Sequence, residues 1–433
     1  MKRIEERATF LTARRIADTA VYGSQDAFSE DVKFVVGQAT DWGPEKVVRV
    51  RDAFDDAVVG FLDALARRIL ADTNARQFPD IIAFAFWCRK ASLEKLRPGV
   101  RAGRATLGRG VGFHVSPSNV PIMAAYNLAM GLIAGNDTIV RVPYRVFPQI
   151  EYLCSAIGAT LSQDGHAALR ATMALIRYDR SRADITRYLS ARCDVRVIWG
   201  GDATVDEIRR APLRPHAHEL TFPDRYSIAV IDGGAWLAAE NKAAQVHGFY
   251  NDTYLNDQAS CASPRMVVWL GQHAREARSD FWPRLEALVG ERYRPFPAQT
   301  VAKLEYAYGM LAQHPGLQLV SSDPRVMRVF SVTPRPELLE WHPNGGVFVE
   351  CEARGLGALV PVLDRRCQTV SYFGLPAEEL VALIRTAGTL GGDRIVPIGQ
   401  TLDFSAIWDG HDILRALSRT IDVFEGPVPR RPS

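Results

Sequence analysis

Cys261 is the residue whose surroundings in the sequence best suit chemistry. The polar segment 256–258 precedes it, small residues follow it, and an apolar strand expected at 266–270 begins only after Pro264. A cysteine that only fills space would sit inside an apolar run, because free cysteine behaves as a small hydrophobe. A reactive thiol instead needs access, together with backbone or cationic groups that favour its thiolate. Taken by itself, Cys261 fits a half-buried structural cysteine as well as a nucleophile.

The composition of the 433-residue chain excludes several classes of protein. Hydrophobic residues at 47% and charged residues at 23% are ordinary for a soluble globular protein, and the length allows two or three domains. A net charge of +3 is too small to indicate a nucleic-acid partner. No apolar run approaches the roughly 20 residues that a membrane span needs. The N-terminal stretch mixes both charge signs and lacks the apolar core of a signal peptide, so we expect a cytoplasmic protein.

The cysteines and histidines form no pattern of metal ligands. Six cysteines are scattered without a CxxC or a Cys/His spacing, which indicates a reducing compartment without disulfides or structural zinc. His216 and His218 are the one close pair of histidines, which is too little to predict a site. We therefore expect no metal.

Residues 111–142 predict a strand, a helix and a second strand. The first strand covers 111–115, Pro121 suits the first position of the helix, and a Gly-Asn pair ends the helix before the strand at 138–142. Such a unit implies a parallel strand pair joined by a right-handed crossover. Asn119 lies in the turn before the helix, where an ordinary helix cap would explain it.

A third strand, at 195–199, leads into Gly200 and Gly201 and then into a helix. Glycines at such a turn let backbone N–H groups and the positive end of the helix approach a phosphate. The signal is weak alone, since a glycine turn is common in α/β domains. Asp202 also fits a plain N-cap, whose charge would oppose a phosphate placed directly on it.

The order of elements predicts an α/β protein. Helices over 1–105 and 148–175, with a fourth strand at 225–231, complete an open and mainly parallel sheet. A second α/β domain follows. Its strands are expected at 266–270, 326–332, 346–350, 359–363 and 368–373, and its helices near 274–290, 299–312 and 377–387.

Both halves of the sequence resemble the aldehyde dehydrogenase superfamily. In its nucleotide domain an asparagine stands two residues before a proline, as Asn119 does here, and an Ala-Gly-Asn like that at 134–136 follows the helix. Gly200 matches the glycine of its phosphate-binding turn, and Asn256 precedes Cys261 by the expected five residues. The resemblance implies an aldehyde-dehydrogenase-like fold of two α/β domains, with open, mainly parallel sheets and a small terminal oligomerisation element.

The closer likeness is to the acyl-CoA reductases, or fatty acid reductases, of bacterial bioluminescence operons. The shared motifs are HVSPSNVP (114–121), AGNDTIVRVP (134–143), RYSIAVID (225–232), NDQASCASP (256–264), TVSYFG (369–374) and GDRIVPIGQTLDFSAIWDGHDIL (392–414). This likeness implies reduction of a fatty acyl-CoA, or another acyl thioester, to the aldehyde through a cysteine thioester. It also implies a nucleotide-binding domain at 1–232 with a helical part at 1–105, a catalytic domain at 233–392, and a segment at 393–433 that packs back on the nucleotide domain and contributes to oligomerisation.

The resemblance assigns the catalytic roles to two residues. Cys261 is the nucleophile, and the side-chain amide of Asn119 joins the backbone N–H of Cys261 in stabilising the oxyanion. Hydrolytic members also carry a glutamate, before the serine that matches Ser227, which activates water. Here no glutamate stands in register, and Glu219 lies two residues too early. A thioester without such a base suits exchange with a thiol or reduction by hydride.

The resemblance also places the cofactor. The residues expected to bind it are Ser116, Pro117, Gly200 and Gly201, with Arg141 and Arg145 near the adenosine ribose. Because arginine pairs bidentately with phosphate and no acid stands between these two, we expect NADPH rather than NADH. Solvated surface arginines are the alternative explanation.

Substrate, partners and two rival functions stay open at this point. The acyl donor is expected to be an acyl-CoA, while a carrier-protein thioester or an acyl-adenylate from an acyl-activating partner enzyme also fits. The superfamily associates through its terminal strands, which implies a homodimer or higher homo-oligomer with 396–433 contributing. One rival is a non-redox cysteine acyltransferase or thioesterase with His247 as base. The other is a catalytically idle interaction subunit on the same fold.

Overall fold

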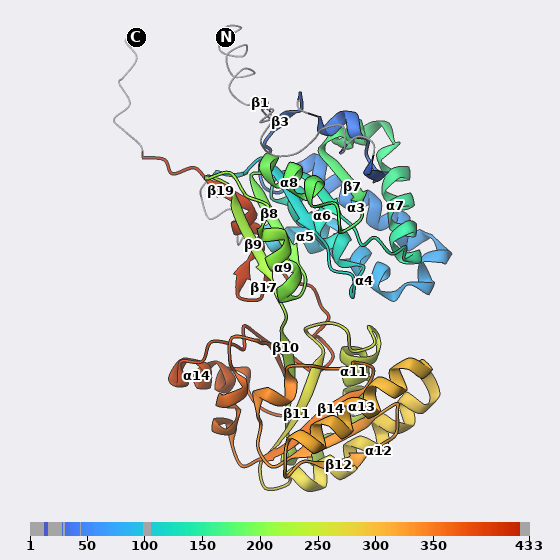
Figure 1. Cartoon of the computed structure of the whole chain (residues 1–433), viewed down its shortest axis with the longest axis vertical. Helices are drawn as coiled ribbons and strands as arrows, with labels where there is room; N and C mark the ends of the chain where they lie inside the picture. The colour runs from blue at the N-terminus through green and yellow to red at the C-terminus, as the bar shows by residue number, and fades with distance from the viewer. Residues whose placement is uncertain (1–12, 16–27, 29–30, 44, 98–104, 425–433) are drawn as a thin grey trace. The chain divides into compact units, whose positions relative to one another are not determined.

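The computed structural model describes residues 13–15, 28, 31–43, 45–97 and 105–424, which divide into two compact units (Figure 1). The first unit comprises residues 1–223 and 411–433, and the second comprises residues 224–410. Each unit is built around one large sheet with helices on both faces (Figure 1). That arrangement is the usual one for parallel strands, because both faces of such a sheet must be buried.

The sheet of the first unit has the strand order β2-β7-β6-β5-β8-β9. In chain order its strands are β2 (Lys33–Val36), β5 (Val111–Val115), β6 (Asp137–Arg141), β7 (Met173–Arg177), β8 (Val195–Trp199) and β9 (His218–Phe222). β5 pairs in parallel with both β6 and β8, and β2 runs antiparallel at the edge. The chain thus moves outward from β5 to β7 and then returns to the other side of β5. This is the winding of dinucleotide-binding sheets.

Two layers of helices bury this sheet. One layer contains α3 (Asp56–Ala71), α4 (Pro79–Cys88), α5 (Lys90–Leu96), α6 (Met123–Ile133) and α7 (Pro148–Leu161), and the other contains α8 (Ala183–Arg192) and α9 (Asp202–Arg209). Every residue of α6 is buried. A helix that is mostly apolar on all sides belongs in the middle of such a layer.

The sheet of the second unit has seven strands in the order β12-β13-β14-β11-β10-β15-β16. They are β10 (Tyr226–Asp232), β11 (Pro264–Leu270), β12 (Gln318–Ser321), β13 (Met327–Ser331), β14 (Val347–Ala353), β15 (Cys367–Phe373) and β16 (Arg394–Pro397). All neighbours are parallel except β12 and β13. Adjacent parallel strands begin at one edge of a sheet, so the segments that enter them also meet there.

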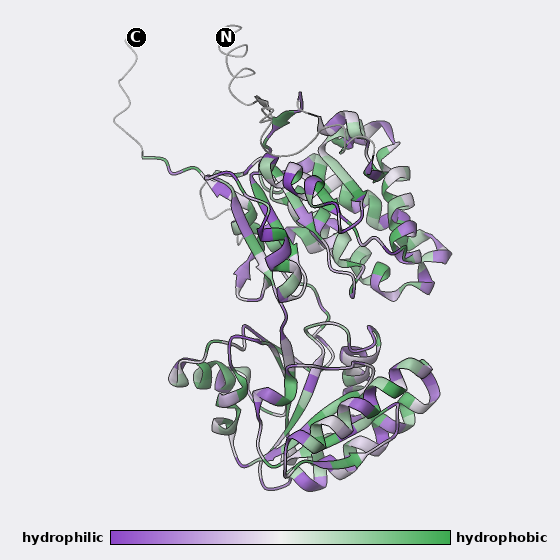
Figure 2. Cartoon of the chain, viewed as in Figure 1, coloured by the Kyte–Doolittle hydropathy of each residue, from purple (hydrophilic) through white to green (hydrophobic). Residues whose placement is uncertain are grey.

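Helices again cover both faces of the second sheet. α10 (Gly233–Ala238), α11 (Lys242–Tyr254) and α12 (Ala274–Arg292) share one core, and α13 (Pro297–Gln313) and α14 (Ala377–Ala387) share the other. In Figure 2 the strands between them are mostly hydrophobic, coloured green, while hydrophilic purple is frequent on the helices. The expected α/β class and parallel sheets are confirmed.

Three predicted elements differ in the structure. The helix expected over 148–175 ends at Leu161, and the buried strand β7 follows it, because a short apolar run cannot be told from a helix by periodicity. Residues 359–362 of the strand expected at 359–363 instead belong to a 3-10 helix, since Pro361 has no N–H to give to a strand ladder. The strand expected at 225–231 forms as β10 but pairs in the second sheet, so the compact units divide at 223/224 rather than at 232.

The end of the described chain returns to the first unit. β19 (Ser418–Thr420) pairs antiparallel with β4 (Thr106–Gly108), and α15 (Ile413–Leu417) precedes it. Asn136 is fully buried and joins this segment to the sheet: its amide donates to the carbonyls of Leu417 at 2.9 Å and Gly131 at 3.3 Å. Its oxygen accepts the backbone N–H groups of Arg109 and Gly110. In the part of the chain that is described, no helix is both long and apolar enough to cross a membrane.

Replacing Asn136 is therefore expected to destabilise the first unit. Asn136→Ala removes the side-chain partner of the N–H groups of Arg109 and Gly110 and of the buried carbonyl of Leu417, which should lower the free energy of unfolding by about 2–4 kcal/mol. Urea unfolding followed by circular dichroism measures the change. Asn74→Ala is the control, since Asn74 is exposed and its loss should cost less than about 0.5 kcal/mol. Equal unfolding curves for the two variants would contradict the argument.

Candidate active site

The first group of predicted residues lies at the carboxyl edge of the first sheet. Ser116 and Pro117 follow β5, and Gly200 and Gly201 follow β8. β5 and β8 are neighbours, and the winding of the chain reverses between them. Ligands of open α/β sheets bind outside the carboxyl ends of the strands at this reversal point. The topology thus brings together four of the predicted cofactor residues.

Ser116 is held in place by two hydrogen bonds. Its backbone N–H donates to the carbonyl of Arg141 at the end of β6, at 3.0 Å. Its hydroxyl accepts the side-chain amide of Asn127 on α6, at 3.1 Å. Ser116 is buried, while Pro117 beside it is half-exposed. In the turn after β5, Ser116 is therefore held in place, while Pro117 is accessible.

The turn after β8 approaches its helix closely. Gly201 is the N-cap of α9, and the carbonyl of Gly201 accepts the N–H of Thr204 at 2.8 Å. A Cβ on Gly200 would lie 2.9 Å from the side chain of Thr204, so a larger residue would force that side chain to move. Asp202 is the first residue of the helix rather than its cap, which corrects the plain N-cap interpretation. Half-exposed glycines at the start of a helix fit the approach of a phosphate.

The two arginines predicted to bind the cofactor, Arg141 and Arg145, differ in their surroundings. Arg141 ends β6, with its guanidinium 4.4 Å from the ring centre of Tyr178. Arg145 is exposed and lies 5.2 Å from the ring centre of Phe147. Asp179 lies close enough to Arg141 for that charge to contribute, after hydrogen bonds from Ser181, to a lowered pKa of its carboxyl. This acid follows β7, a strand that the sequence pattern did not predict, so its position was not foreseen.

Asn119 is exposed in the turn between β5 and α6. The N-cap of α6 is Ile122, whose side chain makes no cap hydrogen bond. Asn119 is thus not the residue that caps α6. Its predicted action on the oxyanion together with Cys261 stays a prediction.

Cys261 lies at the amino edge of the second sheet, three residues before β11. It belongs to a tight turn that the N–H of Ser263 closes on the carbonyl of Ser260, at 3.0 Å. The carbonyl of Cys261 accepts the hydroxyl of Ser227 at 2.6 Å. The same hydroxyl oxygen accepts the N–H of Thr369, at 3.1 Å. One side chain on β10 thereby ties the cysteine turn to β15.

The segment before Cys261 is anchored by Gln258. Its buried side chain donates to the carbonyls of Pro264 and Val347 at 2.8 and 2.9 Å, and accepts the N–H groups of Gly346 and Val347 at 2.9 and 3.1 Å. Asp257 beside it accepts hydrogen bonds from Tyr293 and Gln299. Both Asp257 and Gln258 have positive φ angles of 53° and 55°. Such backbone is costly for these residues, and the side-chain bonds compensate for it.

Several groups act on the Cys261 thiol, and burial has the largest effect. Burial raises the pKa of the thiol above its ordinary value, whereas the Arg265 guanidinium and a hydrogen bond from the backbone N–H of Arg225 lower it. The carboxylates of Asp409 and Asp224 raise it further. Since burial outweighs the lowering groups, the thiol form is favoured. The sequence did not predict these four partners, since they are brought together by sheet topology. Among described residues Cys261 is half-exposed, whereas the other five cysteines are buried.

The two candidate bases, Glu219 and His247, have surroundings that differ from those of Cys261. Glu219 on β9 is held by two arginines, with 2.8 Å between its carboxylate and Nε of Arg196 and 2.7 Å to Nε of Arg209. A carboxylate engaged in this way is a poor general base. His247 lies half-buried on α11 and is not among the described groups that shift the Cys261 pKa. The structure therefore gives no support to either as a water-activating residue.

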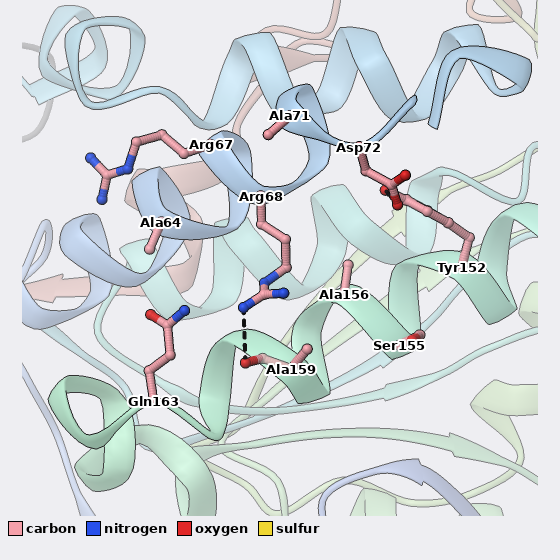
Figure 3. A pocket seen from close by; sticks show the side chains of 10 residues that line it. All are labelled: Ala64, Arg67, Arg68, Ala71, Asp72, Tyr152, Ser155, Ala156, Ala159 and Gln163. Atoms are coloured by element: carbon pink, nitrogen blue, oxygen red, sulfur yellow. Dashed lines mark hydrogen bonds between the residues drawn. The ribbon is translucent and has the colours of Figure 1, made fainter. Parts of the chain in front are cut away.

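A surface groove of about 610 Å³ lies between α3 and α7 (Figure 3). Its walls are alanines and polar side chains that are bonded within the unit. Arg68 donates to the carbonyl of Ala159, and Tyr152 donates to Asp72 at 2.9 Å. The groove contains none of the predicted site residues. Within the described ranges, no three His, Cys, Asp or Glu side chains are grouped to hold a metal ion.

Comparisons with known proteins agree with this architecture. A sequence profile of the family described as acyl-CoA reductase (LuxC) matches residues 45–314. A long-chain acyl-protein thioester reductase of Vibrio harveyi is 22% identical over 320 residues, which cover 72% of this chain and 63% of that protein. The chain thus spans a little under two thirds of that relative's length.

Solved structures of low sequence identity share the fold. PnpE in complex with nicotinamide adenine dinucleotide matches 87% of this chain and 88% of its own, at 12% identity and a TM-score of 0.62. An NAD-dependent aldehyde dehydrogenase from Sinorhizobium meliloti matches 87% of this chain and 81% of its own, at 13% identity and a TM-score of 0.60. The aldehyde-dehydrogenase-like fold that the sequence implied is confirmed.

The setting of Cys261 predicts its reactivity in solution. Iodoacetamide should label Cys261 first, because the other five cysteines are buried. Since the thiol pKa lies above its ordinary value, the rate should still rise by almost tenfold for each pH unit between pH 7 and 9. Mass spectrometry of peptides from timed samples measures both quantities, with Cys261→Ser as the control. A rate that levels off below pH 8 would contradict the raised pKa.

Proposed function

Because the chain belongs to the acyl-CoA reductase (LuxC) family, we propose that it is a nicotinamide-dependent reductase of acyl thioesters. The substrate would be a fatty acyl-CoA or another acyl thioester, and the product the aldehyde. The observation that carries this proposal is a half-exposed cysteine in a tight turn that is fixed to the central strands of its sheet. A nucleophile needs such access and such fixed placement.

In the proposed reaction, the sulfur of Cys261 attacks the acyl carbonyl carbon. A sulfur–carbon bond forms, the bond to the thiol of the donor breaks, and that thiol leaves, so the acyl group stays on the enzyme. The backbone N–H of Cys261 and the side-chain amide of Asn119 are proposed to stabilise the oxyanion. Losing one such donor typically costs about 3 kcal/mol of barrier. With Glu219 engaged by Arg196 and Arg209, hydrolysis of the thioester is disfavoured.

The carboxyl edge of the first sheet fits a nicotinamide dinucleotide. Gly200 lies so close to Thr204 that a Cβ would fill the space over the turn, and the half-exposed glycines let a phosphate reach the start of α9. When bound, the reduced cofactor would supply the hydride that converts the acyl-enzyme to the aldehyde. Ser116 and Pro117 would line the neighbouring turn after β5. Fixing these turns is the contribution of the chain itself.

We further propose NADPH rather than NADH as this cofactor. Arg141 is the better candidate for the 2′-phosphate, because it ends β6 and its guanidinium is supported by the ring of Tyr178. Asp179 lies near it and would oppose a second negative charge, so the arginine must outweigh that acid. Arg145 is exposed and would add a weaker, screened contribution.

The donor, the partners and the assembly are also proposals. An acyl-CoA is the simplest donor, and a carrier-protein thioester or an acyl-adenylate from a partner enzyme would present the same reactive carbonyl. Association of two or more copies through the terminal segments is implied by the family's superfamily, and size-exclusion chromatography of the intact chain tests it. We place the enzyme in the cytoplasm, where its thiols would stay reduced.

Absorbance at 340 nm with acyl-CoAs of graded length tests the proposed reaction. The wild-type chain should oxidise NADPH in step with CoA release, and Cys261→Ala should lose at least about 10³ of the rate while still binding the nucleotide. CoA release without NADPH oxidation would favour the acyltransferase or thioesterase with His247. No turnover of any acyl thioester by the wild type would favour an idle interaction subunit.

The cofactor preference is tested by nucleotide binding alone. Arg141→Ala should weaken NADPH by roughly tenfold or more and leave NADH within about twofold, because a lost charge-assisted bond to phosphate costs about 1.5–3 kcal/mol. Arg145→Ala is the matched control and should change NADPH binding by less than about threefold. Titrations by nucleotide fluorescence measure both. Equal loss of NADPH and NADH in Arg141→Ala would remove the assignment.

A further inference from the structure

Arg265 stands at an irregular point of β11, two strand positions from the cysteine turn. Ser227 of β10 pairs with Pro264, but the next residue, Ile228, pairs with Met266. Arg265 is therefore the extra residue of a β-bulge. A bulge re-aims the side chain of its extra residue and is frequent beside functional sites. The carbonyl of Leu339, before β14, accepts the guanidinium of Arg265 at 3.2 Å.

Among the described residues, the guanidinium of Arg265 lacks the carboxylate partner that three buried arginines have. Arg196 has Glu219, Arg177 has Glu151 and Arg225 has Asp393 within ion-pair distance. Within the described residues, Arg265 has no such ion pair, and its Nε–H, like that of Arg225, is sealed from solvent without an acceptor. A buried cation without a counter-charge lowers the stability of the fold, so an anion close to the Arg265 guanidinium would be stabilising.

The groups that face Arg265 leave few sources for that anion. Tyr306 on α13 donates its hydroxyl to the carbonyl of Leu338 and stays neutral, because burial raises its pKa. His342 is neutral as well, since burial and the nearby Arg265 lower its pKa to about 3. Arg366, before β15, repels the guanidinium. The carboxylate of Asp224 attracts the guanidinium, as does the sulfur of Cys261 once it is ionised.

We propose that Arg265 is the counter-cation of the Cys261 thiolate, aimed at the sulfur by the bulge at the start of β11. This role rests on the proposed function in one respect, that Cys261 is the nucleophile. Arg265 lowers the pKa of Cys261 more than any other described group, which agrees with this placement. Asp409 acts in the opposite sense. Its side chain is almost fully buried, 3.8 Å from the guanidinium of Arg225 and 2.6 Å from the amide of Gln368.

Two charges thus act on the pKa of Cys261 in opposite directions. Arg265 favours the thiolate, and the ionised carboxyl of Asp409 disfavours it. Burial raises the pKa of Asp409 to about 6, and Asp393 acts in the same direction, whereas Arg225, Gln368 and Arg394 act against it. Asp409 is therefore ionised at the pH of the measurement below.

The test is the pH dependence of Cys261 alkylation in the full chain without substrate or cofactor. Arg265→Gln keeps a donor for Leu339 and removes the charge, so the midpoint of the profile should rise by about one pH unit, with roughly threefold slower labelling at pH 8 because a more basic thiolate is also more nucleophilic. Arg265→Lys should keep the midpoint within about 0.5 pH unit. Asp409→Asn should lower the midpoint.

Two results would overturn the proposal. One is a midpoint in Arg265→Gln that stays at the wild-type value or falls, and the other is an upward change in Arg265→Lys as large as that in Arg265→Gln. Arg366→Gln is the matched control, since Arg366 is not among the groups with the largest effects on Cys261, and its midpoint should change far less than that of Arg265→Gln. Alkylation does not require acyl transfer or hydride transfer. A chain that fails as a reductase can still pass this test, and a true reductase can fail it.

Discussion

The hydroxyl of Ser227 is the point on which the geometry around Cys261 depends. It donates to the carbonyl of Cys261 and accepts the N–H of Thr369, so it bonds to the segments on both sides of β10. The strand register slips at this residue toward both neighbours. A register shift leaves backbone groups without a partner in the neighbouring strand. Here the Ser227 hydroxyl bonds two of them, the carbonyl of Cys261 and the N–H of Thr369. Cys261 is consequently fixed to β10, an interior strand of a seven-stranded sheet, although it lies in a turn.

The two sheets offer their functional residues at opposite kinds of edge. In the first unit the turns after β5 and β8 meet at the carboxyl edge, where open α/β sheets bind ligands. In the second unit the groups that act on Cys261 precede β10, lie at the start of β11, or come from the segment before residue 411, and gather at the amino edge. Parallel pairing explains both gatherings. It also explains why Arg225 and Arg265, which are 40 positions apart in sequence, act on one sulfur.

The sequence predicted what local pattern and motif can carry. The unit from 111 to 142, the glycine turn at Gly200 and the strand after Cys261 appear where their residues indicated. The strand β10 was recognised, but not its sheet, because strand pairing is non-local information. The bulge at Arg265 and the four hydrogen bonds of Gln258 could not be predicted from the sequence either, since each depends on which strands are neighbours in the sheet.

The expectation that Cys261 sits among groups favouring its thiolate is correct in part, and the correction has a physical cause. A cysteine that the sequence places in a loop among small residues can still be shielded from water in the fold. Burial of this kind disfavours the charged form of any thiol. The same low-polarity surroundings strengthen the attraction between a thiolate and a guanidinium, because charge interactions are screened less there. A retained arginine without a carboxylate lowers stability, whereas the paired Arg196 and Arg225 do not leave a charge uncompensated. A purely structural arginine would be better placed beside a carboxylate, which agrees with the proposed role of Arg265 toward the sulfur of Cys261.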